Sequence, residues 1–348
     1  MERFLKEIKD WIKSLIIAVF VSAFIRWLAF DHFSVPTSSM EGTILTGDHL
    51  IVSKLEYGPR TPNTPIQMPL THRAFMGIKS FSDVIKLPSF RLFSLQKVKR
   101  GDIIIFNLPK EIEYPIDMRE LYIKRCVATP GDLIEIKNSK LFINNENEKN
   151  YDVQKRYIIK SNRFISSKFF EKYEIADYLK VETGYLAFIK KSNVKKIKSE
   201  EKLSVELCST PKEFIDNEIE FNKSETHQWN CDNMGPFKVP KKGMMINITP
   251  ENLAIYGFVI LNHEKLKNVK ILNNILIIDG VKVYDYTFKK NYYFAMGDNR
   301  HNSIDSRYWG FIPEDHIIGK PRLVVFSKNS NANNFFNYIR WKRLFKLF

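Results

Sequence analysis

The longest apolar stretch of the chain lies near its N-terminus. Residues 11–30, WIKSLIIAVFVSAFIRWLAF, are interrupted by charge only at Lys13 and Arg26. A helix needs about 20 apolar residues to cross the hydrocarbon core of a bilayer, and a long basic side chain near either end can reach the interface. The pattern therefore predicts an uncleaved transmembrane helix. It favours this over a cleaved signal peptide, because no small-x-small cleavage site follows the apolar core.

Basic residues are distributed unevenly around this segment. Arg3, Lys6, Lys9 and Lys13 precede its apolar centre, whereas no Lys or Arg follows Arg26 until residue 54. Because Lys and Arg are retained on the cytoplasmic side, we expect residues 1–10 to be cytoplasmic and the chain beyond residue 30 to lie outside.

Beyond residue 30, short apolar runs alternate with turns rich in Gly, Asp, Asn and Pro, which is typical of β structure. Residues 57–95 break this pattern and are expected to form an irregular surface loop. The expected strands are residues 49–55, 101–106, 121–127, 133–137, 140–143, 185–189, 275–278 and 281–286.

The last segment, residues 335–348 (FFNYIRWKRLFKLF), mixes aromatic and basic residues. On a helix, Tyr338, Trp341, Phe345 and Phe348 would share one face. Two interpretations stay open: an interfacial helix lying on the outer membrane surface, or a terminal segment packed on the folded domain.

Composition adds few constraints. The chain has 348 residues and a formal charge of +15, but its basic residues are scattered and form no nucleic-acid-binding motif, so we expect no nucleic-acid partner. The cysteines, Cys126, Cys208 and Cys231, form neither a zinc pattern nor a disulfide framework. A Cys208–Cys231 disulfide is possible if that region lies outside the cytoplasm.

A turn rich in hydroxyl groups follows the apolar segment. Residues 35–43, VPTSSMEGT, place Thr37, Ser38 and Ser39 in succession. A serine hydroxyl is a weak nucleophile that needs a base within hydrogen-bond reach. The turn is therefore either a linker or the holder of a nucleophile at a membrane surface. Residue chemistry alone does not say which hydroxyl would attack.

Lys124 is a candidate base. It lies in the run 121–127, LYIKRCV, where strand alternation places Tyr122, Lys124 and Cys126 on one face. A lysine acts as a base only where burial lowers its pKa and populates the neutral amine. A lysine within a strand is more often a solvated edge residue, so this motif alone does not indicate catalysis.

Polar residues are concentrated a third time at residues 297–310, GDNRHNSIDSRYWG. Burying so many polar groups is costly unless they satisfy one another. The segment is either a surface turn or a network that orients a catalytic group.

Taken together and in this order, these segments resemble bacterial type I signal peptidases, membrane-anchored Ser/Lys endopeptidases that remove signal peptides from exported proteins. Each motif is weak alone, but the ordered set is specific. The resemblance covers the apolar segment, residues 35–43, Arg100-Gly101-Asp102, residues 122–127 with Pro130-Gly131-Asp132, and residues 297–310.

The resemblance implies a role for each matching residue. Ser39 would be the nucleophile and Lys124 the general base. The Thr37 hydroxyl and the Ser39 backbone N–H would form the oxyanion hole. Ser303 would hydrogen-bond Lys124, supported by Asp305 with Arg307. The residues implied to line shallow apolar pockets for small substrate side chains are Val35, Pro36, Met40, Ile44, Tyr122 and Ile123.

The expected fold is mostly β. The resemblance implies a signal-peptidase-like catalytic domain preceded by one transmembrane helix, whereas residues 145–274, rich in Lys, Glu and Asn, show no such resemblance and are interpreted from their composition as an inserted second β-rich lobe. We divide the chain into a cytoplasmic N-terminus (1–10), an anchor (11–30), two parts of the catalytic domain (31–144 and 275–334), the inserted lobe (145–274) and a C-terminal segment (335–348).

The resemblance also implies a cellular setting. It places the anchor in the bacterial inner (cytoplasmic) membrane and the catalytic domain on the outer, periplasmic side, close to the secretion translocon. Signal peptides of exported preproteins and membrane lipid are the expected partners, and no cofactor or metal is implied.

Three other functions fit the sequence less well. A cytosolic self-cleaving Ser/Lys repressor is disfavoured by the apolar anchor and the missing DNA-binding segment. A non-enzymatic, membrane-tethered binding module on the same scaffold should have lost Ser39 or Lys124. A sortase-like thiol mechanism would need an activated Cys126, and its strand setting offers no activation.

Overall fold

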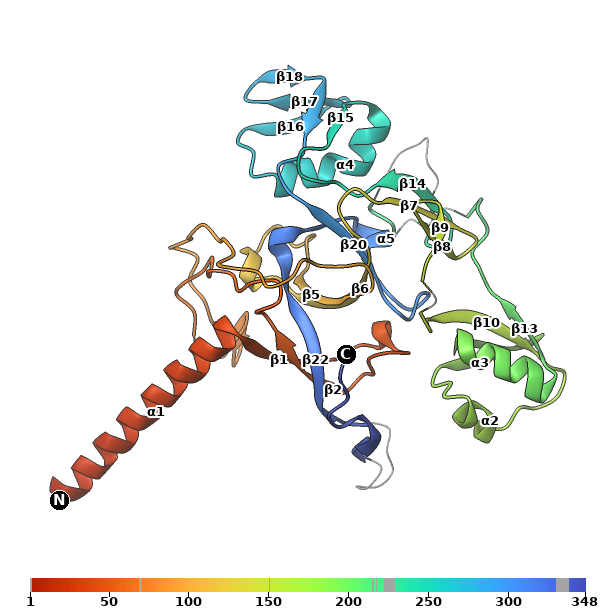
Figure 1. Ribbon diagram of the computed structural model, residues 1–348, viewed down its shortest axis with the longest axis horizontal. Helices are drawn as coiled ribbons and strands as arrows, with labels where there is room; N and C mark the ends of the chain where they lie inside the picture. Colours follow the sequence, from red (N-terminus) through yellow and green to blue (C-terminus); the bar gives the residue numbers. More distant parts are fainter. Residues whose placement is uncertain are drawn as a thin grey trace.

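The computed structural model describes residues 2–68, 71–149, 151–214, 216, 218–221, 229–329 and 338–348. Helix α1 (Glu2–Leu28) projects away from the rest of the protein (Figure 1). Its apolar part is not buried by other residues, and its length and composition suit a membrane crossing. The helix ends two residues earlier than predicted because strand β1 (Phe30–Ser34) begins almost immediately.

A seven-stranded antiparallel sheet forms the centre of the protein. Its strands, in spatial order, are β1, β2 (Asp48–Ser53), β22 (Ile317–Ser327), β5 (Ile103–Asn107), β6 (Leu121–Ala128), β20 (Tyr292–Met296) and β21 (Ile312–Pro313). Segments from both ends of the sequence therefore meet in one sheet.

Both faces of this sheet are covered. Ile103 and Ile105 of β5 pack into one apolar core with Met40, whereas Ile104 and Phe106 pack into a second core on the opposite face. The continuous apolar run of β5 follows from this, since a strand buried on both faces has no reason to alternate apolar and polar residues.

Residues 133–287 form most of the smaller sheets. One contains β14 (Met234–Lys238), β7 (Leu133–Lys137), β8 (Lys140–Ile143) and β9 (Glu146–Asn147). A second contains β11 (Tyr178–Val181), β12 (Gly184–Lys190), β10 (Gln154–Lys160) and β13 (Ser204–Leu207). A third contains β16 (Val269–Leu272), β17 (Ile275–Ile278) and β18 (Val281–Val283). Two-stranded pairs join β15 (Met245–Asn247) to β19 (Asp285–Thr287) and β3 (Ala74–Phe75) to β4 (Ile78–Lys79).

The helices beyond α1 are short, apart from α4. Helix α4 (Pro250–His263) begins where the Thr249 hydroxyl accepts a hydrogen bond from Asn252 N–H, with Pro250 in the first turn. The others are α2 (Ser167–Lys172), α3 (Lys191–Lys196), α5 (Ser306–Trp309), the π-helical turn η3 (Ile197–Glu201) and the 3₁₀ turns η1 (Ser38–Met40), η2 (Ile116–Met118), η4 (Glu314–His316) and η5 (Trp341–Arg343).

The mostly β fold with one apolar N-terminal helix is confirmed, and the expected strands form with small shifts of their ends. The expected strand at 281–286 is divided between β18 and β19. Residues 57–95 contain, where described, only the short pair β3 and β4. The domain boundaries stay a prediction: β14, from the segment expected to be inserted, pairs with β7 of the segment preceding it.

The structure answers two questions that the sequence left open. Of the two interpretations of residues 335–348, the described part, 338–348, fits a terminal segment packed on the folded domain. Apart from the 3₁₀ turn η5 it is not helical, because it pairs with β22: Phe345 N–H donates to the Val324 carbonyl, and Val324 N–H to the Lys346 carbonyl. Phe348 packs partly against the core. Residues 335–337 lie outside the described residues. Cys208 and Cys231 are both free thiols and form no disulfide.

Candidate active site

The hydroxyl-rich turn follows β1 and forms the short helix η1 (Ser38–Met40). Glu41 N–H closes it with a 3.0 Å hydrogen bond to the Ser38 carbonyl. The Met40 side chain is fully buried in the core beneath the turn. Because Met40 fixes the turn from below, Ser39 is held at the protein surface with only 8% of its area exposed.

Lys124 reaches this turn from β6, in the middle of the central sheet. Its Nζ lies 2.7 Å from Ser39 Oγ, and the side chain is buried. The Tyr122 ring, 5.2 Å from Nζ, forms part of the wall beside the amine. Folding thus brings together two residues that are 85 positions apart in the sequence.

Burial lowers the pKa of Lys124 to about 8, because the ammonium loses its hydration. The charges of Asp305 and Asp298 oppose this shift, and that of Arg307 adds to it. With a pKa of about 8, about a tenth of the lysines are neutral at pH 7, against fewer than about one in a thousand at the ordinary value. The amine can therefore accept a proton from Ser39 at neutral pH.

The polar segment at residues 297–310 packs directly against the turn. Asn299 N–H donates to the Ser39 carbonyl (3.0 Å), and Asn299 Nδ2 donates to the Ser38 carbonyl (3.3 Å). Asn302 Nδ2 donates to Ser38 Oγ (3.0 Å). The sequence indicated a network here but did not assign these two asparagines. Their contacts leave Ser39 Oγ free to face Lys124 while its neighbour Ser38 is occupied.

Asp305 and Arg307 form a fully buried ion pair, with Nη2 2.8 Å from Oδ2. Burial alone would raise the pKa of Asp305, but Arg307 holds it below its ordinary value. Asp305 also accepts a hydrogen bond from Gly297 N–H. The expected hydrogen bond from Ser303 to Lys124 is not formed: Ser303 Oγ is buried and has no partner among the described residues, although Ser303 and Lys124 line the same cleft.

A second buried ion pair joins β6 to this segment. Arg125 contacts Asp298 through two hydrogen bonds of 2.7 and 2.6 Å, and Thr43 Oγ1 donates to the same carboxylate. Removing one partner of such a pair would strand a buried charge. Arg125 stands next to Lys124 in sequence, so the pair fixes the strand that carries the candidate base.

A cleft of about 1080 Å³ opens beside Ser39 and Lys124. Thr37 lines it, with its Oγ1 3.4 Å from Ser39 Oγ. Of the residues expected to contact substrate, Pro36, Tyr122 and Ile123 line this cleft. Val35, Met40 and Ile44 do not line it: they are buried beneath it in one apolar core and support its floor.

The sequence matches a family model at residues 8–200 and 262–326, and that model is described as signal peptidase, peptidase S26. The chain belongs to this family. The signal peptidase domain is split by an insertion, since residues 201–261 lie outside the match.

Sequence similarity to curated relatives covers nearly the whole chain. It is similar to signal peptidase I of Buchnera aphidicola subsp. Schizaphis graminum, with 30% identity over 96% of this chain and 80% of the relative. It is also similar to signal peptidase I of Helicobacter pylori 26695, at 24% over 97% and 90% of the two chains. For the Haemophilus influenzae enzyme the identity is 22%, over 98% and 76%. The protein is accordingly a serine endopeptidase of the signal peptidase I type.

Cys126 is poorly suited to act as a nucleophile in this peptidase. Its side chain is fully buried, and burial raises the pKa of the thiol well above its ordinary value. A thiol nucleophile needs the opposite, a lowered pKa and access to substrate. The thiol alternative is therefore not supported.

Gly297 offers a test of how closely the polar segment packs on the turn Ser38–Met40, which holds the candidate nucleophile Ser39 and is called the nucleophile turn below. An added Cβ would lie 2.5 Å from the Ser39 carbonyl oxygen and would also overlap Ser303. Gly297→Ala should therefore displace the turn and reduce kcat about 100-fold, since a misplacement of about 1 Å can cost that much. The measurement is kcat on a preprotein substrate, with circular dichroism to check folding.

Gly257→Ala is the matched control. Gly257 lies on helix α4, and its new Cβ would meet only the flexible end of the Ile271 side chain, so we expect parental activity. Parental kcat in Gly297→Ala would show that the packing of this segment on Ser39 is unimportant for the reaction.

Proposed function

We propose that this signal peptidase cleaves signal peptides from exported preproteins by acyl transfer to Ser39, with Lys124 as the general base. The observation that carries the proposal is the 2.7 Å contact between Lys124 Nζ and Ser39 Oγ, with the pKa of the lysine lowered to about 8. A weak nucleophile thus faces a base that is partly neutral at physiological pH.

The proton moves in four steps. Neutral Lys124 takes the proton of Ser39 as Oγ attacks the carbonyl carbon of the scissile peptide. The resulting ammonium gives its proton to the departing amine, which leaves an acyl-enzyme on Ser39. Lys124, neutral again, then takes a proton from the water that attacks the ester, and it returns this proton to Ser39 Oγ when the acid product leaves.

Charge on the carbonyl oxygen develops next to Ser39 in both tetrahedral intermediates. The Thr37 hydroxyl is one oxyanion donor in this proposal. Its position supports this role, because its Oγ1 lies 3.4 Å from Ser39 Oγ at the wall of the cleft. The Ser39 backbone N–H is the second donor in this proposal. Removing one such donor typically costs about 100-fold in kcat or more.

The strand arrangement supports an extended substrate. Residues 121–124 pair with β5 on one side, whereas β20 pairs with β6 only from Arg125 onward, so the other edge of 121–124 has no strand partner among the described residues. An extended peptide can add to this edge and place alternate side chains in the cleft. Tyr122 and Ile123 at the cleft wall favour small side chains one and three residues before the cut.

The anchor accounts for where the reaction takes place. Ser39 follows the end of α1 by eleven residues, at most about 40 Å of extended chain, so it stays close to the bilayer. The basic residues that precede the apolar centre favour a cytoplasmic N-terminus and a catalytic domain on the periplasmic side of the inner membrane. A signal peptide leaving the secretion translocon, still held by its own apolar core, would present its cleavage site there.

The experiment uses the full-length protein in detergent and two preproteins that differ only at the cut. One has alanine at the positions one and three residues before the cut, and the other has leucine at both. We expect the first to be cut at that bond, as read by N-terminal sequencing of the product, and the second to be cut at least about 100-fold more slowly, because a pocket shaped for a small residue rejects a larger one by several kcal/mol. Equal cleavage of the two would contradict the substrate assignment.

A further inference from the structure

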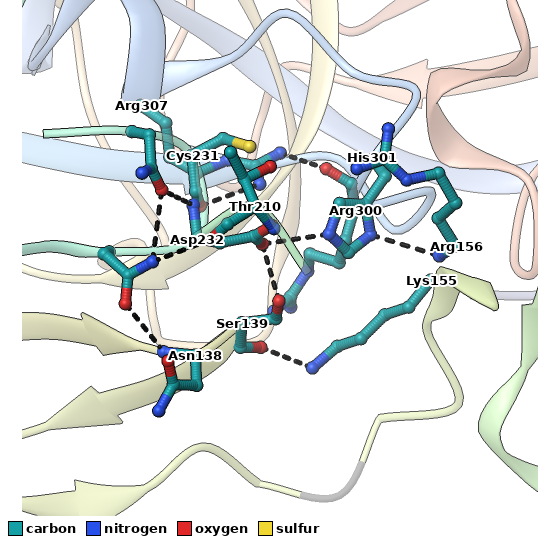
Figure 2. Close-up of polar contacts among 12 residues, drawn as sticks. Asn138, Ser139, Lys155, Arg156, Thr210, Cys231, Asp232, Arg300, His301 and Arg307 are labelled. Carbon is teal, nitrogen blue, oxygen red and sulfur yellow. Dashed lines mark hydrogen bonds and ion pairs between the residues drawn. The ribbon is translucent and has the colours of Figure 1, made fainter. Parts of the chain in front are cut away.

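A second buried polar cluster lies apart from the Ser39–Lys124 pair, around Asp232 (Figure 2). The Asp232 carboxylate accepts three hydrogen bonds, from Ser139 Oγ (2.7 Å), Thr210 N–H (2.7 Å) and His301 Nε2 (2.9 Å). The side chains of Asp232 and His301 are each only 2% exposed. Ser139 belongs to the β7–β8 turn, and Thr210 follows β13, so the carboxylate joins two sheets to the segment that contains His301.

The Ser139, Asp232 and His301 cluster is not a second hydrolytic triad. In a triad the histidine lies between the serine and the carboxylate and takes the serine proton. Here the carboxylate lies between the other two, and Ser139 donates to it directly. The second nitrogen of His301, Nδ1, accepts a hydrogen bond from Arg156 N–H (3.1 Å) and is unavailable as a base for Ser139.

These contacts define the state of His301. Because Nδ1 accepts from a backbone N–H, the ring proton is on Nε2 and is donated to Asp232. Burial keeps the pKa of His301 below its ordinary value, opposed by Asp232 and assisted by the charges of Arg307 and Arg156. The imidazole is therefore a neutral link with both nitrogens engaged, one to strand β10 and one to Asp232.

The same segment also contacts the nucleophile turn. Asn302, the next residue after His301, donates to Ser38 Oγ, and Asn299 N–H donates to the Ser39 carbonyl. Residues 299–302 are thus hydrogen-bonded to Asp232 through His301 and to the nucleophile turn through Asn299 and Asn302. The role of residues 145–274, which contain Asp232, was not evident from sequence.

We propose that Asp232, acting through His301, is a positioning residue that fixes the 299–302 segment against the Ser39 turn. This inference rests on the proposed function, because it concerns the placement of Ser39 relative to Lys124. Without the Asp232–His301 link the segment would loosen, Ser39 would be less well placed for attack, and water would reach the Lys124 amine.

Asp232→Asn tests this role. All three partners of Asp232 are donors, so an amide must direct N–H toward at least one of them. We expect kcat to fall about 10-fold to 100-fold. We also expect the acid limb of the pH–rate profile to move to higher pH, because hydrating the ammonium of Lys124 reduces the main cause that depresses its pKa.

Glu264→Gln is a matched control, because Glu264, like Asp232, lies within residues 145–274. Glu264 is also buried and accepts three hydrogen bonds, from Tyr286 and Tyr292 hydroxyls and Lys289 N–H. The Glu264→Gln substitution, like Asp232→Asn, replaces a buried carboxylate that accepts three hydrogen bonds and should therefore destabilise the fold. Glu264, however, has no contact with residues 299–302. Both variants should melt at a lower temperature than the parent, and only Asp232→Asn should change kcat and the acid limb. Identical kcat and pH profiles in the two variants would overturn the inference.

His301 provides a second route if Asp232→Asn fails to fold. His301→Gln retains an N–H that can reach Asp232, whereas His301→Ala removes it. We expect the glutamine variant to lie nearer the parent in kcat and acid limb. Equal values in the two, whether parental or reduced, would contradict a role for the Asp232 link. Ser39→Ala assayed alongside separates the two proposals: its activity tests the proposed function, and the Asp232 and His301 variants test the positioning role alone.

Discussion

Ser39→Ala should fold like the parent and lose about 10⁴-fold to 10⁶-fold in kcat on a preprotein substrate. The substitution removes the hydroxyl that faces the amine of Lys124 at 2.7 Å. It introduces no strain, because alanine occupies less space at a position fixed by its buried neighbour Met40. The residual rate would come from substrate binding and the oxyanion donors. The measurement is single-turnover cleavage with purified full-length protein.

Ser38→Ala is the control, since sequence alone could not say which hydroxyl attacks. It removes the hydrogen bond from Asn302 Nδ2 but leaves Ser39 and Lys124 in contact. We expect a loss of less than about tenfold, the scale of one hydrogen bond. If the Ser38 variant were the inactive one and the Ser39 variant active, the nucleophile would be misassigned.

Lys124→Met should lower kcat about 10⁴-fold, a loss comparable to that of Ser39→Ala, because no other described base lies next to Ser39. Methionine has a similar length and no charge, so it fills the buried site. At pH 7 the parent carries mostly an ammonium there, which burial disfavours. The variant should therefore be at least as stable as the parent at neutral pH, as read from thermal unfolding.

Lys155→Met is a stringent control for the Lys124→Met variant. Burial lowers the pKa of Lys155 to about 8 as well, but its Nζ contacts the Ser139 carbonyl and not Ser39. We expect this variant to retain an acid limb like that of the parent. If Lys155→Met abolished cleavage and Lys124→Met did not, the lowered pKa would have been assigned to the wrong lysine.

Sequence reasoning was most successful where the signal is local. The apolar segment gave α1, and the alternation within 121–127 predicted that Ile123 and Cys126 lie on opposite faces, where they pack into different cores. Turn residues gave the hairpin β7–β8 at Asn138 and Ser139, both of which adopt left-handed backbone conformations. These features depend on neighbouring residues only.

Several contacts of the candidate active site could not be predicted from the sequence. The resemblance paired Ser39 with Lys124, but the hydrogen bonds of Asn299 and Asn302 to the turn depend on how three distant segments pack. The same is true of the Asp232–His301 link. For Ser303 the expected hydrogen bond is missing, and for the C-terminal segment the edge of β22 offered backbone partners that a helix would have forgone.

The central claim is that neutral Lys124 is the base for Ser39, and the pH dependence of kcat/KM tests it most directly. The substrate should lack ionisable side chains around the cut. Because the pKa of Lys124 is lowered to about 8, the reactive amine is present above that pH, and the rate should fall about tenfold per pH unit below it. A rate that stays constant down to about pH 6 would contradict a lysine base.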